Sequence, residues 1–307
     1  MKHIPHTLPI IDGIKPSYLV LPHEKQWQNK PLLDFLCAQF PFVNKQAWRL
    51  RLNSGMVFDA NGEALNEYVL FQAGKTIFYY RAISRNKEPR IPFDEQILWL
   101  DEHLIVVDKP HFLPVIPSGR FLRETLLSRL RVHPDLQHLN VGDITPIHRL
   151  DKDTAGVMLF SHNPASRAAY QNLFQNRAVK KIYHAIAPKR DDLSYPIQVQ
   201  SRMVRGADFF LTQEVDGTPN AFTQIDLLAY RGENGLYELR PLTGKKHQLR
   251  VHMSRLGMPI LHDMLYPKVL PVDTEDYARP LKLLAKEIGF CDPFSQTWRS
   301  FSSLQQL

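Results

Sequence analysis

The sequence has only two cysteines among its 307 residues, Cys37 and Cys291, and they lie far apart. This excludes a disulfide framework and the paired-cysteine spacing of a structural zinc site, and it favours reduced thiols in a cytoplasmic protein. No apolar run approaches the roughly 20 residues that a membrane helix needs. The first residues combine lysine, histidine and proline in place of an apolar core, so we expect no secretory signal.

Two apparent ligand motifs fail on spacing. A phosphate-binding loop needs a glycine five residues before its Gly-Lys pair, and Val69 stands at that position before Gly74. His247 and His252 are five residues apart, which is a poor spacing for joint metal ligation from a helix or a strand. We therefore expect neither a metal nor an organic cofactor.

Acidic residues are outnumbered. Lys and Arg total 38 against 31 Asp and Glu, which gives a formal charge of +7. This excess favours an anionic partner, with nucleic acid as the leading candidate. A hydrophobic fraction of 44% is ordinary for a globular protein, and the length predicts one large domain with a smaller one.

The most informative stretch runs from Pro146 to Phe160. Its first half gathers charged and hydroxyl side chains on one short loop: His148, Arg149, Asp151, Lys152, Asp153 and Thr154. After Gly156 the run 157–160 is apolar and too short for a helix, so it predicts a buried strand. Catalytic groups are often placed on loops held by such strands. Taken alone, the composition of the loop favours an ordinary solvated turn, in which Asp and Thr bond their own backbone.

The N-terminal third predicts a small αα-β module over residues 31–83, after an extended lead-in over 1–30. Helices are expected at 32–40 and, capped by Asn44, up to Leu52, followed by a hairpin turned at Asn61-Gly62 and a strand at 76–80. The charged stretch 84–90 predicts the boundary to a second domain over 91–307. The module's second helix carries Lys45, Arg49 and Arg51, which suggests a nucleic-acid surface or a solvated basic face.

In the second domain we expect a hairpin over 97–107 that ends in Lys109-Pro110. A helix over 121–131 should turn Arg123, Arg129 and Arg131 outward. A helix should start at Asn163-Pro164, a strand should cover 180–186, and a further helix should begin at a Thr243 cap and end at Gly257.

Within about residues 97–290, four motifs follow one another along the chain in the order found in the RluA family of RNA pseudouridine synthases, which this part of the sequence resembles. The loop reads His148-Arg149-Leu150-Asp151-Lys152-Asp153-Thr154-Ala155-Gly156 against His-Arg-Leu-Asp-x-x-Thr-Ser-Gly in the family. The others are Lys109-Pro110, the Lys-x-Tyr-x-Ala motif around Tyr183, and Thr-Gly-Lys-x-His-Gln-x-Arg-x-His from Thr243. The N-terminal module more loosely resembles RNA-binding domains of the ribosomal protein S-four type.

The resemblance implies an α+β fold, with a long mixed, mainly antiparallel sheet and a central cleft, and an isomerase that converts uridine in ribosomal or transfer RNA to pseudouridine. Asp151 would be the nucleophile, Arg250 its cationic partner, and Tyr183 the surface against the flipped base. Substrate-binding residues would be His148, Arg149, Thr154, Leu249, Lys245 and His247. RNA would be the partner of Lys45, Arg49 and Arg51, and the protein is expected to be a monomer.

Several positions depart from the family pattern. His111-Phe112 follow Lys109-Pro110 where glycine is usual, His262 also replaces a glycine, and Lys245 replaces an arginine, which keeps the charge but loses the bidentate fork. The role of Lys109 is open between structure and RNA phosphate. Two other functions compete: a non-catalytic RNA-binding protein on the same scaffold, and a glycosidase, which would need a second working carboxylate such as Asp153.

Overall fold

The computed structural model describes residues 8–81, 88–208, 210–271 and 276–307. The chain divides into two compact units, one of residues 1–88 with 119–123, the other of residues 89–118 with 124–307. Most of the predicted boundary stretch 84–90 lies outside the described residues. No helix of the described residues is long and apolar enough to cross a membrane.

The first unit is the predicted small module. Helices α1 (Leu32–Gln39) and α2 (Lys45–Asn53) precede strands β2 (Val57–Phe58) and β3 (Thr76–Tyr79). Asn44 caps α2 as expected, because its Oδ1 accepts the Ala47 N–H at 2.7 Å. The core includes Leu36 and Trp48, whose exposed fractions are 0% and 1%.

The lead-in contributes to this module, which the sequence did not indicate. Strand β1 (Ser17–Val20) pairs antiparallel with β3, and the sheet order is β1-β3-β2. β1 has only four residues. Its alternation of half-buried and exposed positions is too short to predict a strand from the sequence.

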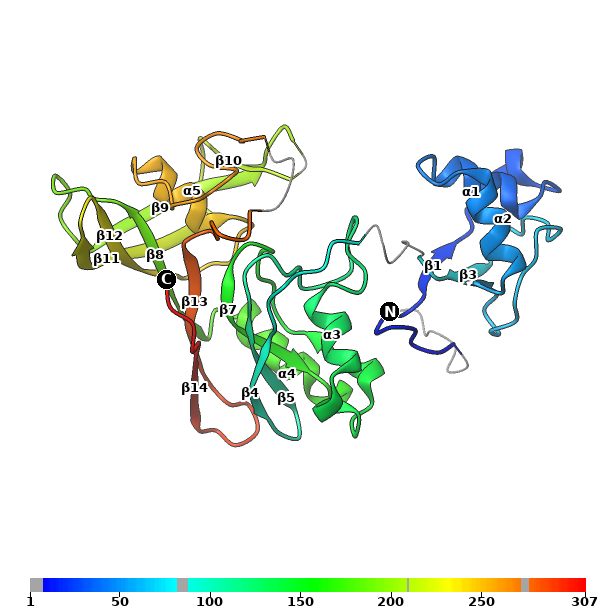
Figure 1. Ribbon diagram of the computed structural model, residues 1–307, viewed down its shortest axis with the longest axis horizontal. Helices are drawn as coiled ribbons and strands as arrows, with labels where there is room; N and C mark the ends of the chain where they lie inside the picture. The colour runs from blue at the N-terminus through cyan, green and yellow to red at the C-terminus, as the bar shows by residue number, and fades with distance from the viewer. Residues whose placement is uncertain (1–7, 82–87, 209, 272–275) are drawn as a thin grey trace. The chain divides into compact units, whose positions relative to one another are not determined.

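The second unit is built on an eleven-stranded sheet of described residues (Figure 1). The strands are β4 (Gln96–Leu100), β5 (Leu104–Lys109), β6 (Thr145–Pro146), β7 (Ala155–Ser161), β8 (Val179–Pro188), β9 (Ile197–Arg205), β10 (Thr212–Val215), β11 (Ala221–Arg231), β12 (Asn234–Pro241), β13 (Leu283–Cys291) and β14 (Trp298–Ser302). Their order is β10-β9-β11-β12-β8-β13-β7-β5-β4, with β14 on β13 and β6 on β7. All pairs are antiparallel except β13 with β7.

Three helices accompany this sheet: α3 (Leu126–Val132), α4 (Pro164–Gln175) and α5 (Gln248–Arg255). In Figure 1, α3 and α4 lie beside the β4, β5 and β7 half, whereas α5 lies by β9 to β11. Each half has its own apolar cluster, one around Tyr170 of α4 and Leu159 of β7, the other around Met253 of α5 and Tyr237 of β12. The parallel contact between β13 and β7 therefore lies where the halves meet.

Several local predictions are confirmed. β7 covers the predicted apolar run and is buried at every position, β8 covers 180–186, and Asn163 caps α4 with Pro164 at its first turn. The helix expected over 121–131 is wrong at its start: α3 begins at Leu126 because Thr125 is in an extended conformation and its Oγ1 accepts the Ser128 N–H at 3.2 Å. Arg131 is also buried instead of outward, and its guanidinium donates to the Ile144 carbonyl at 3.2 Å.

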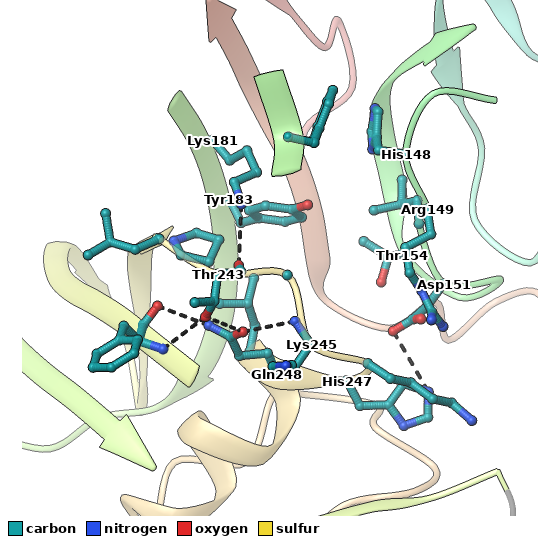
Figure 2. Close-up of a pocket in the computed structure, with 18 of the residues that line it drawn as sticks. His148, Arg149, Asp151, Thr154, Lys181, Tyr183, Thr243, Lys245, His247 and Gln248 are labelled. Atoms are coloured by element: carbon teal, nitrogen blue, oxygen red, sulfur yellow. Dashed lines mark hydrogen bonds and ion pairs between the residues drawn. The ribbon is translucent and has the colours of Figure 1, made fainter. Parts of the chain in front are cut away.

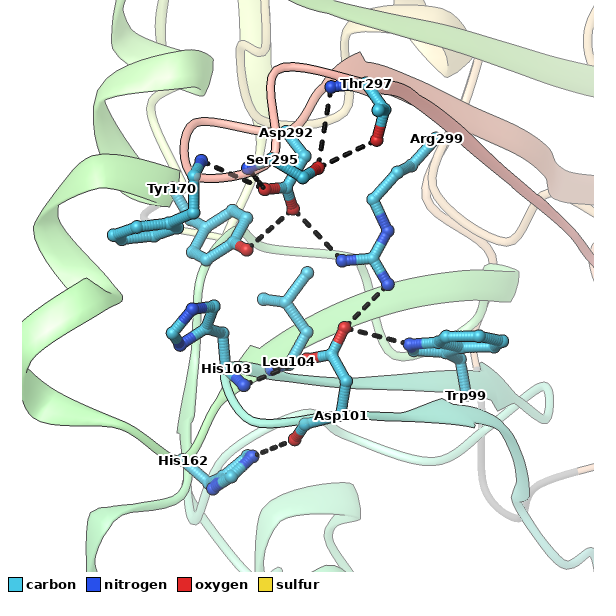
Figure 3. Close-up of polar contacts among 11 residues, drawn as sticks. Trp99, Asp101, His103, Leu104, His162, Tyr170, Asp292, Ser295, Thr297 and Arg299 are labelled. Atoms are coloured by element: carbon cyan, nitrogen blue, oxygen red, sulfur yellow. Dashed lines mark hydrogen bonds and ion pairs between the residues drawn. The ribbon is translucent and has the colours of Figure 1, made fainter.

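A polar network fastens the β4–β5 turn to the C-terminal hairpin (Figure 3). Arg299 on β14 donates to Asp101 at 2.6 Å and to Asp292 at 3.0 Å. Asp292 also accepts from the Tyr170 hydroxyl of α4 at 2.8 Å, and Asp101 accepts from the N–H groups of His103 and Leu104 at 2.9 Å. The first strands of the sheet are thereby tied to its last.

Candidate active site

The loop that carries Asp151 joins β6 to β7 and is closed by a turn, in which the Thr154 N–H donates to the Asp151 carbonyl at 3.2 Å. Gly156 follows with φ +115°, and a Cβ there would lie 2.2 Å from the carbonyl oxygen of Ala285. Only glycine permits this approach of β7 to β13. The motif glycine thus sets where the parallel pairing begins and where Asp151 projects.

Lys109 supports this loop from behind. Its Nζ is fully buried and donates, at 2.9 Å each, to the carbonyls of Pro110, Leu113 and Lys152. Burial lowers the pKa of Lys109 to about 7, against the opposing charges of Asp153 and Asp151. Since the ammonium has no path to solvent, the open question about Lys109 is answered in favour of structure over an RNA phosphate contact.

His111 adds a second hold on the loop, because its Nδ1 lies 2.7 Å from the Asp153 carbonyl and must be the protonated nitrogen. At the next position Phe112 has φ +65°, in the region that favours glycine. Its buried ring packs against Phe93 and Tyr277, with centroids 6.0 and 5.2 Å away. The chain therefore keeps a left-handed backbone where the family has glycine, held by aromatic packing.

His262 repeats this arrangement. It also replaces a family glycine, has φ +63°, and its Nδ1 lies 2.9 Å from the Pro280 carbonyl. Both departures noted in the sequence thus preserve the turn that glycine would make, at a cost in backbone strain of the order of 1 kcal/mol each.

His148 also helps to hold the Asp151 loop in place. Its Nε2 accepts the Leu159 N–H of β7 at 3.0 Å, and its ring stacks on Phe174 of α4 with centroids 4.6 Å apart. Burial lowers the pKa of His148 to about 4, so the ring is neutral at pH 7, as an acceptor must be. The next residue, Arg149, is exposed.

Tyr183 of β8 lies across a cavity of about 610 Å³ from the loop (Figure 2). Burial and then the charge of Asp151 raise the pKa of the Tyr183 hydroxyl above its ordinary value, so it stays protonated. The cavity is lined by all nine site residues predicted in this unit: His148, Arg149, Asp151, Thr154, Tyr183, Lys245, His247, Leu249 and Arg250. The other three, Lys45, Arg49 and Arg51, belong to the first unit.

The lining of the cavity is strongly cationic. Among the described residues that line it, the lysines and arginines are Arg149, Arg177, Lys181, Lys245, Lys246 and Arg250, and the one carboxylate is that of Asp151. Lys181 and Arg177 did not stand out in the sequence as site residues. Burial, and next the charge of Arg177, lower the pKa of Lys181 to about 8, and its Nζ lies 3.3 Å from the Thr243 carbonyl.

The segment 243–250 departs from its predicted form. Helix α5 begins at Gln248, and Thr243 does not cap it. The Thr243 Oγ1 instead accepts the Phe222 N–H at 2.9 Å and donates to Gln248 Oε1 at 2.8 Å, while Gln248 Nε2 donates to the Phe222 carbonyl at 2.9 Å. Gln248 therefore fixes this loop to β11.

The expected direct pairing of Arg250 with Asp151 is wrong. Both side chains of the pair Arg250 and Asp263 are buried, and the guanidinium donates to the two Asp263 oxygens at 2.8 and 2.5 Å. Asp263 also accepts the Leu265 and Tyr266 N–H groups, so its position is fixed by backbone. The guanidinium therefore forms its bidentate hydrogen bond with Asp263. Arg250 interacts with Asp151 only through the electrostatic attraction between nearby charges.

His247 approaches Asp151 from the segment that precedes α5, and its Nε2 lies 3.8 Å from Asp151 Oδ2 (Figure 2). Among the described residues, no group of three or more His, Cys, Asp or Glu side chains is placed to hold a metal ion. The arrangement offers one carboxylate, Asp151, one flat aromatic surface, Tyr183, and a rim with the exposed cations Arg149 and Lys245, which suits an anionic substrate.

Comparison with known proteins agrees with this geometry. Residues 103–255 match the family model described as RNA pseudouridylate synthase. An uncharacterised RNA pseudouridine synthase of Synechocystis is 30% identical over 256 residues, covering 81% of this chain and 84% of that protein. The dual-specificity RNA pseudouridine synthase RluA of Pasteurella multocida is 30% identical, covering 67% of this chain and 91% of its own length.

Among solved structures, human RNA Pseudouridylate Synthase Domain Containing 4 superposes with a TM-score of 0.52 at 28% identity, covering 68% of this chain and 88% of that one. Fold, motif order and cavity lining agree with the same assignment. The chain belongs to the RluA-type family of RNA pseudouridine synthases, which are isomerases.

Proposed function

We propose that this enzyme isomerises specific uridines of ribosomal or transfer RNA, with Asp151 as the nucleophile and with the target base flipped out of its stack. The observation that carries the proposal is that, among the described residues, Asp151 is the one carboxylate of a cavity that is also lined by six lysines and arginines and by Tyr183. A stacked base is inaccessible to such a cavity, so it must first be extruded.

The reaction breaks the bond from uracil N1 to ribose C1′ and forms one from C5 to C1′. The proton leaves C5 and N1 gains one, so the overall change is an isomerisation. Asp151 would form the covalent intermediate that lets the base detach and turn. Tyr183 would supply the surface for the base, and Arg149 and Lys245, both exposed, would meet phosphates.

The competing functions make different demands on the same cavity. A glycosidase of the usual kind needs two carboxylates across the scissile bond, and Asp153 is not among the residues that line this cavity. Asp153 instead pairs with Lys152 at 3.3 Å. A non-catalytic RNA-binding protein would bind RNA in the same place and leave uridine unchanged.

Asp151→Asn and Asp153→Asn form a matched pair for the test, since both remove one charge from the same loop. We expect Asp151→Asn to abolish pseudouridine formation, with a loss of at least about 10⁴-fold in single-turnover rate. Asp153→Asn should keep most of the rate. Equal loss in both variants would refute Asp151 as nucleophile, and RNA binding without any product from the native protein would favour the non-catalytic alternative.

The target is best found by mapping pseudouridine in RNA from cells with and without the gene. Positions lost in the knockout and restored by the native protein, but not by Asp151→Asn, are the substrates.

We further propose that the N-terminal unit contacts RNA as S-four domains do, and that the protein acts as a monomer in the cytoplasm. The basic helix α2 supports the first statement. The two free thiols, Cys37 and Cys291, support a reducing location.

A further inference from the structure

His247 lies between the proposed nucleophile and a tyrosine hydroxyl. Its Nε2 is 3.8 Å from Asp151 Oδ2, and its Nδ1 is 2.9 Å from the Tyr266 hydroxyl. The His247 and Tyr266 rings meet edge to face, with centroids 5.6 Å apart. One imidazole therefore joins the Asp151 loop to the loop that follows Asp263.

The imidazole is held in one place by its backbone. His247 has φ +55° and precedes the first residue of α5, and it is 9% exposed. Left-handed backbone is unfavourable for histidine and, where it occurs, is often found at functional sites. The adjacent Gln248, bonded to β11, prevents the segment from relaxing.

The Tyr266 hydroxyl has one proton and two places to donate it. It accepts the Thr212 N–H of β10 at 2.9 Å. It can then donate either to His247 Nδ1 at 2.9 Å or to the Thr212 carbonyl at 3.2 Å. The choice decides the tautomer of the histidine, because the nitrogen that accepts cannot carry the proton of a neutral ring.

The two choices differ at Asp151. If Tyr266 donates to Nδ1, the proton of His247 is on Nε2 and an N–H dipole points toward the carboxylate. If Tyr266 donates to Thr212, Nδ1 carries the proton and a lone pair on Nε2 faces the anion. Both arrangements keep the 2.9 Å hydrogen bond between His247 Nδ1 and the Tyr266 hydroxyl, with the donor reversed, and the second adds the 3.2 Å bond to the Thr212 carbonyl. The first is the one that places an N–H, and not a lone pair, toward the Asp151 carboxylate.

A doubly protonated ring is excluded at neutral pH. Burial is the main cause that lowers the pKa of His247 to about 4. Asp151 and Asp263 oppose this shift, whereas Arg250 and Lys246 add to it. The neutral imidazole therefore has to be one of the two tautomers.

We propose that Tyr266 is a positioning residue that holds His247 in its Nε2–H tautomer, so that this N–H orients the Asp151 carboxylate through Oδ2 and leaves Oδ1 to attack. The proposal rests on Asp151 being the nucleophile. At 3.8 Å the contact is longer than a hydrogen bond, and contacts of this kind shorten when substrate closes the site. The proposal gives a role in the reaction to Thr212 and Tyr266, which lie outside the four family motifs.

The direct test is the ¹⁵N resonance pattern of His247 in the full-length protein at pH 7, which separates protonated from unprotonated ring nitrogens. We expect Nε2–H in the native protein and a smaller Nε2–H fraction in Tyr266→Phe, where only Asp151 still favours that tautomer. Nδ1–H in the native protein would overturn the proposal, whatever the activity of the variants.

Single-turnover kinetics test the consequence. Tyr266→Phe should slow the reaction between about 10- and 100-fold, the scale of losing alignment of a reacting group, with unchanged affinity for RNA. Tyr195→Phe is the matched control, since that hydroxyl has only long contacts to the Arg190 carbonyl at 3.4 Å and Met258 Sδ at 3.6 Å, and the residue is not among those that line the cavity. A normal rate in Tyr266→Phe would refute the proposal.

A double-mutant cycle separates positioning from general damage to the fold. His247→Gln, which keeps a side-chain N–H donor, should retain more rate than His247→Ala. If Tyr266 acts through His247, Tyr266→Phe should cause no further loss in the His247→Ala background. Additive losses would show that Tyr266 acts independently.

Failure here is distinguishable from failure of the proposed function. Pseudouridine formed by the native protein and lost in Asp151→Asn upholds the function even if Tyr266→Phe is fully active. If no RNA is modified by the native protein, the function itself fails, while the ¹⁵N pattern still reports on the tautomer.

Discussion

The cations of the N-terminal unit and those on the rim of the cavity differ in what they already contact. In the module, Lys45 pairs with Asp34 at 2.8 Å and Arg49 pairs with Glu67 at 2.7 Å. On the rim, Arg149 and Lys245 are exposed, and no carboxylate among the described residues lies within ion-pair distance of either. Positive charge alone did not distinguish these residues in the sequence, although Lys45 and Arg49 are in ion pairs and Arg149 and Lys245, among the described residues, are not.

Arg250 is the exception within the cavity, because it is paired and buried. Arg250→Ala would leave Asp263 as a buried, unpaired charge, which typically costs about 3–5 kcal/mol of stability. We expect turnover to fall much more than RNA affinity, with Arg250→Lys restoring only part, since the fork is lost. Thermal melts with single-turnover rates check this. Weak RNA binding with normal turnover at saturation would make Arg250 a phosphate contact instead.

Substitution of the rim cations Arg149 and Lys245 should have the next largest effect, and it should be on the affinity for RNA. Each phosphate contact that is removed lowers the slope of log affinity against log salt by about 0.7–0.9. Arg149→Ala and Lys245→Ala should each weaken RNA binding and flatten that slope by one such step. A salt titration by filter binding measures it. Arg299→Lys is unsuitable as a control because it disturbs the hairpin network, whereas Arg240→Ala, paired with Asp226 at 3.2 Å, is suitable.

The resemblance of the four motifs was enough to predict the family, the sheet class and the nine site residues that line one cavity. The buried β7 followed from a local pattern, an apolar run too short for a helix. The partner of Arg250 was not predictable in this way. Asp263 was visible in the sequence, but its capture of the guanidinium depends on a turn whose N–H groups fix the carboxylate.

The two missing glycines show the converse. Phe112 and His262 stand where the family has glycine, and both have left-handed backbone. Packing with Phe93 and Tyr277, and a hydrogen bond to Pro280, come from residues distant in sequence, so propensity alone could not reveal them. Thr243 failed as a cap for the same reason, since Phe222 and Gln248 use its hydroxyl.

The ion pair between Asp101 and Arg299 stabilises the fold, and its contribution to stability should be lost in acid. Burial opposes ionisation of Asp101, but the His103 and Leu104 N–H groups, Trp99 and Arg299 outweigh it and lower its pKa from 3.8 to about 2. A depressed folded-state pKa means stability that is present above pH 4 and is lost as pH falls toward 2. Asp101→Asn should flatten the loss of stability in that window, followed by circular dichroism. An unchanged acid transition would contradict this.

The module should show the smallest effect, because two of its cations, Lys45 and Arg49, are already in ion pairs. Exposed ion pairs contribute about 0–1 kcal/mol, so Lys45→Ala and Arg49→Ala should change RNA affinity and salt slope little. The informative changes are the reverse ones. Asp34→Asn and Glu67→Gln release Lys45 and Arg49 and, if the module lies on RNA, should tighten binding and steepen the salt slope. Glu63→Gln removes the same charge from an exposed residue without releasing a cation and serves as control. If all three variants behave alike, the module makes no phosphate contact through α2, and the rim supplies the electrostatic part of RNA affinity.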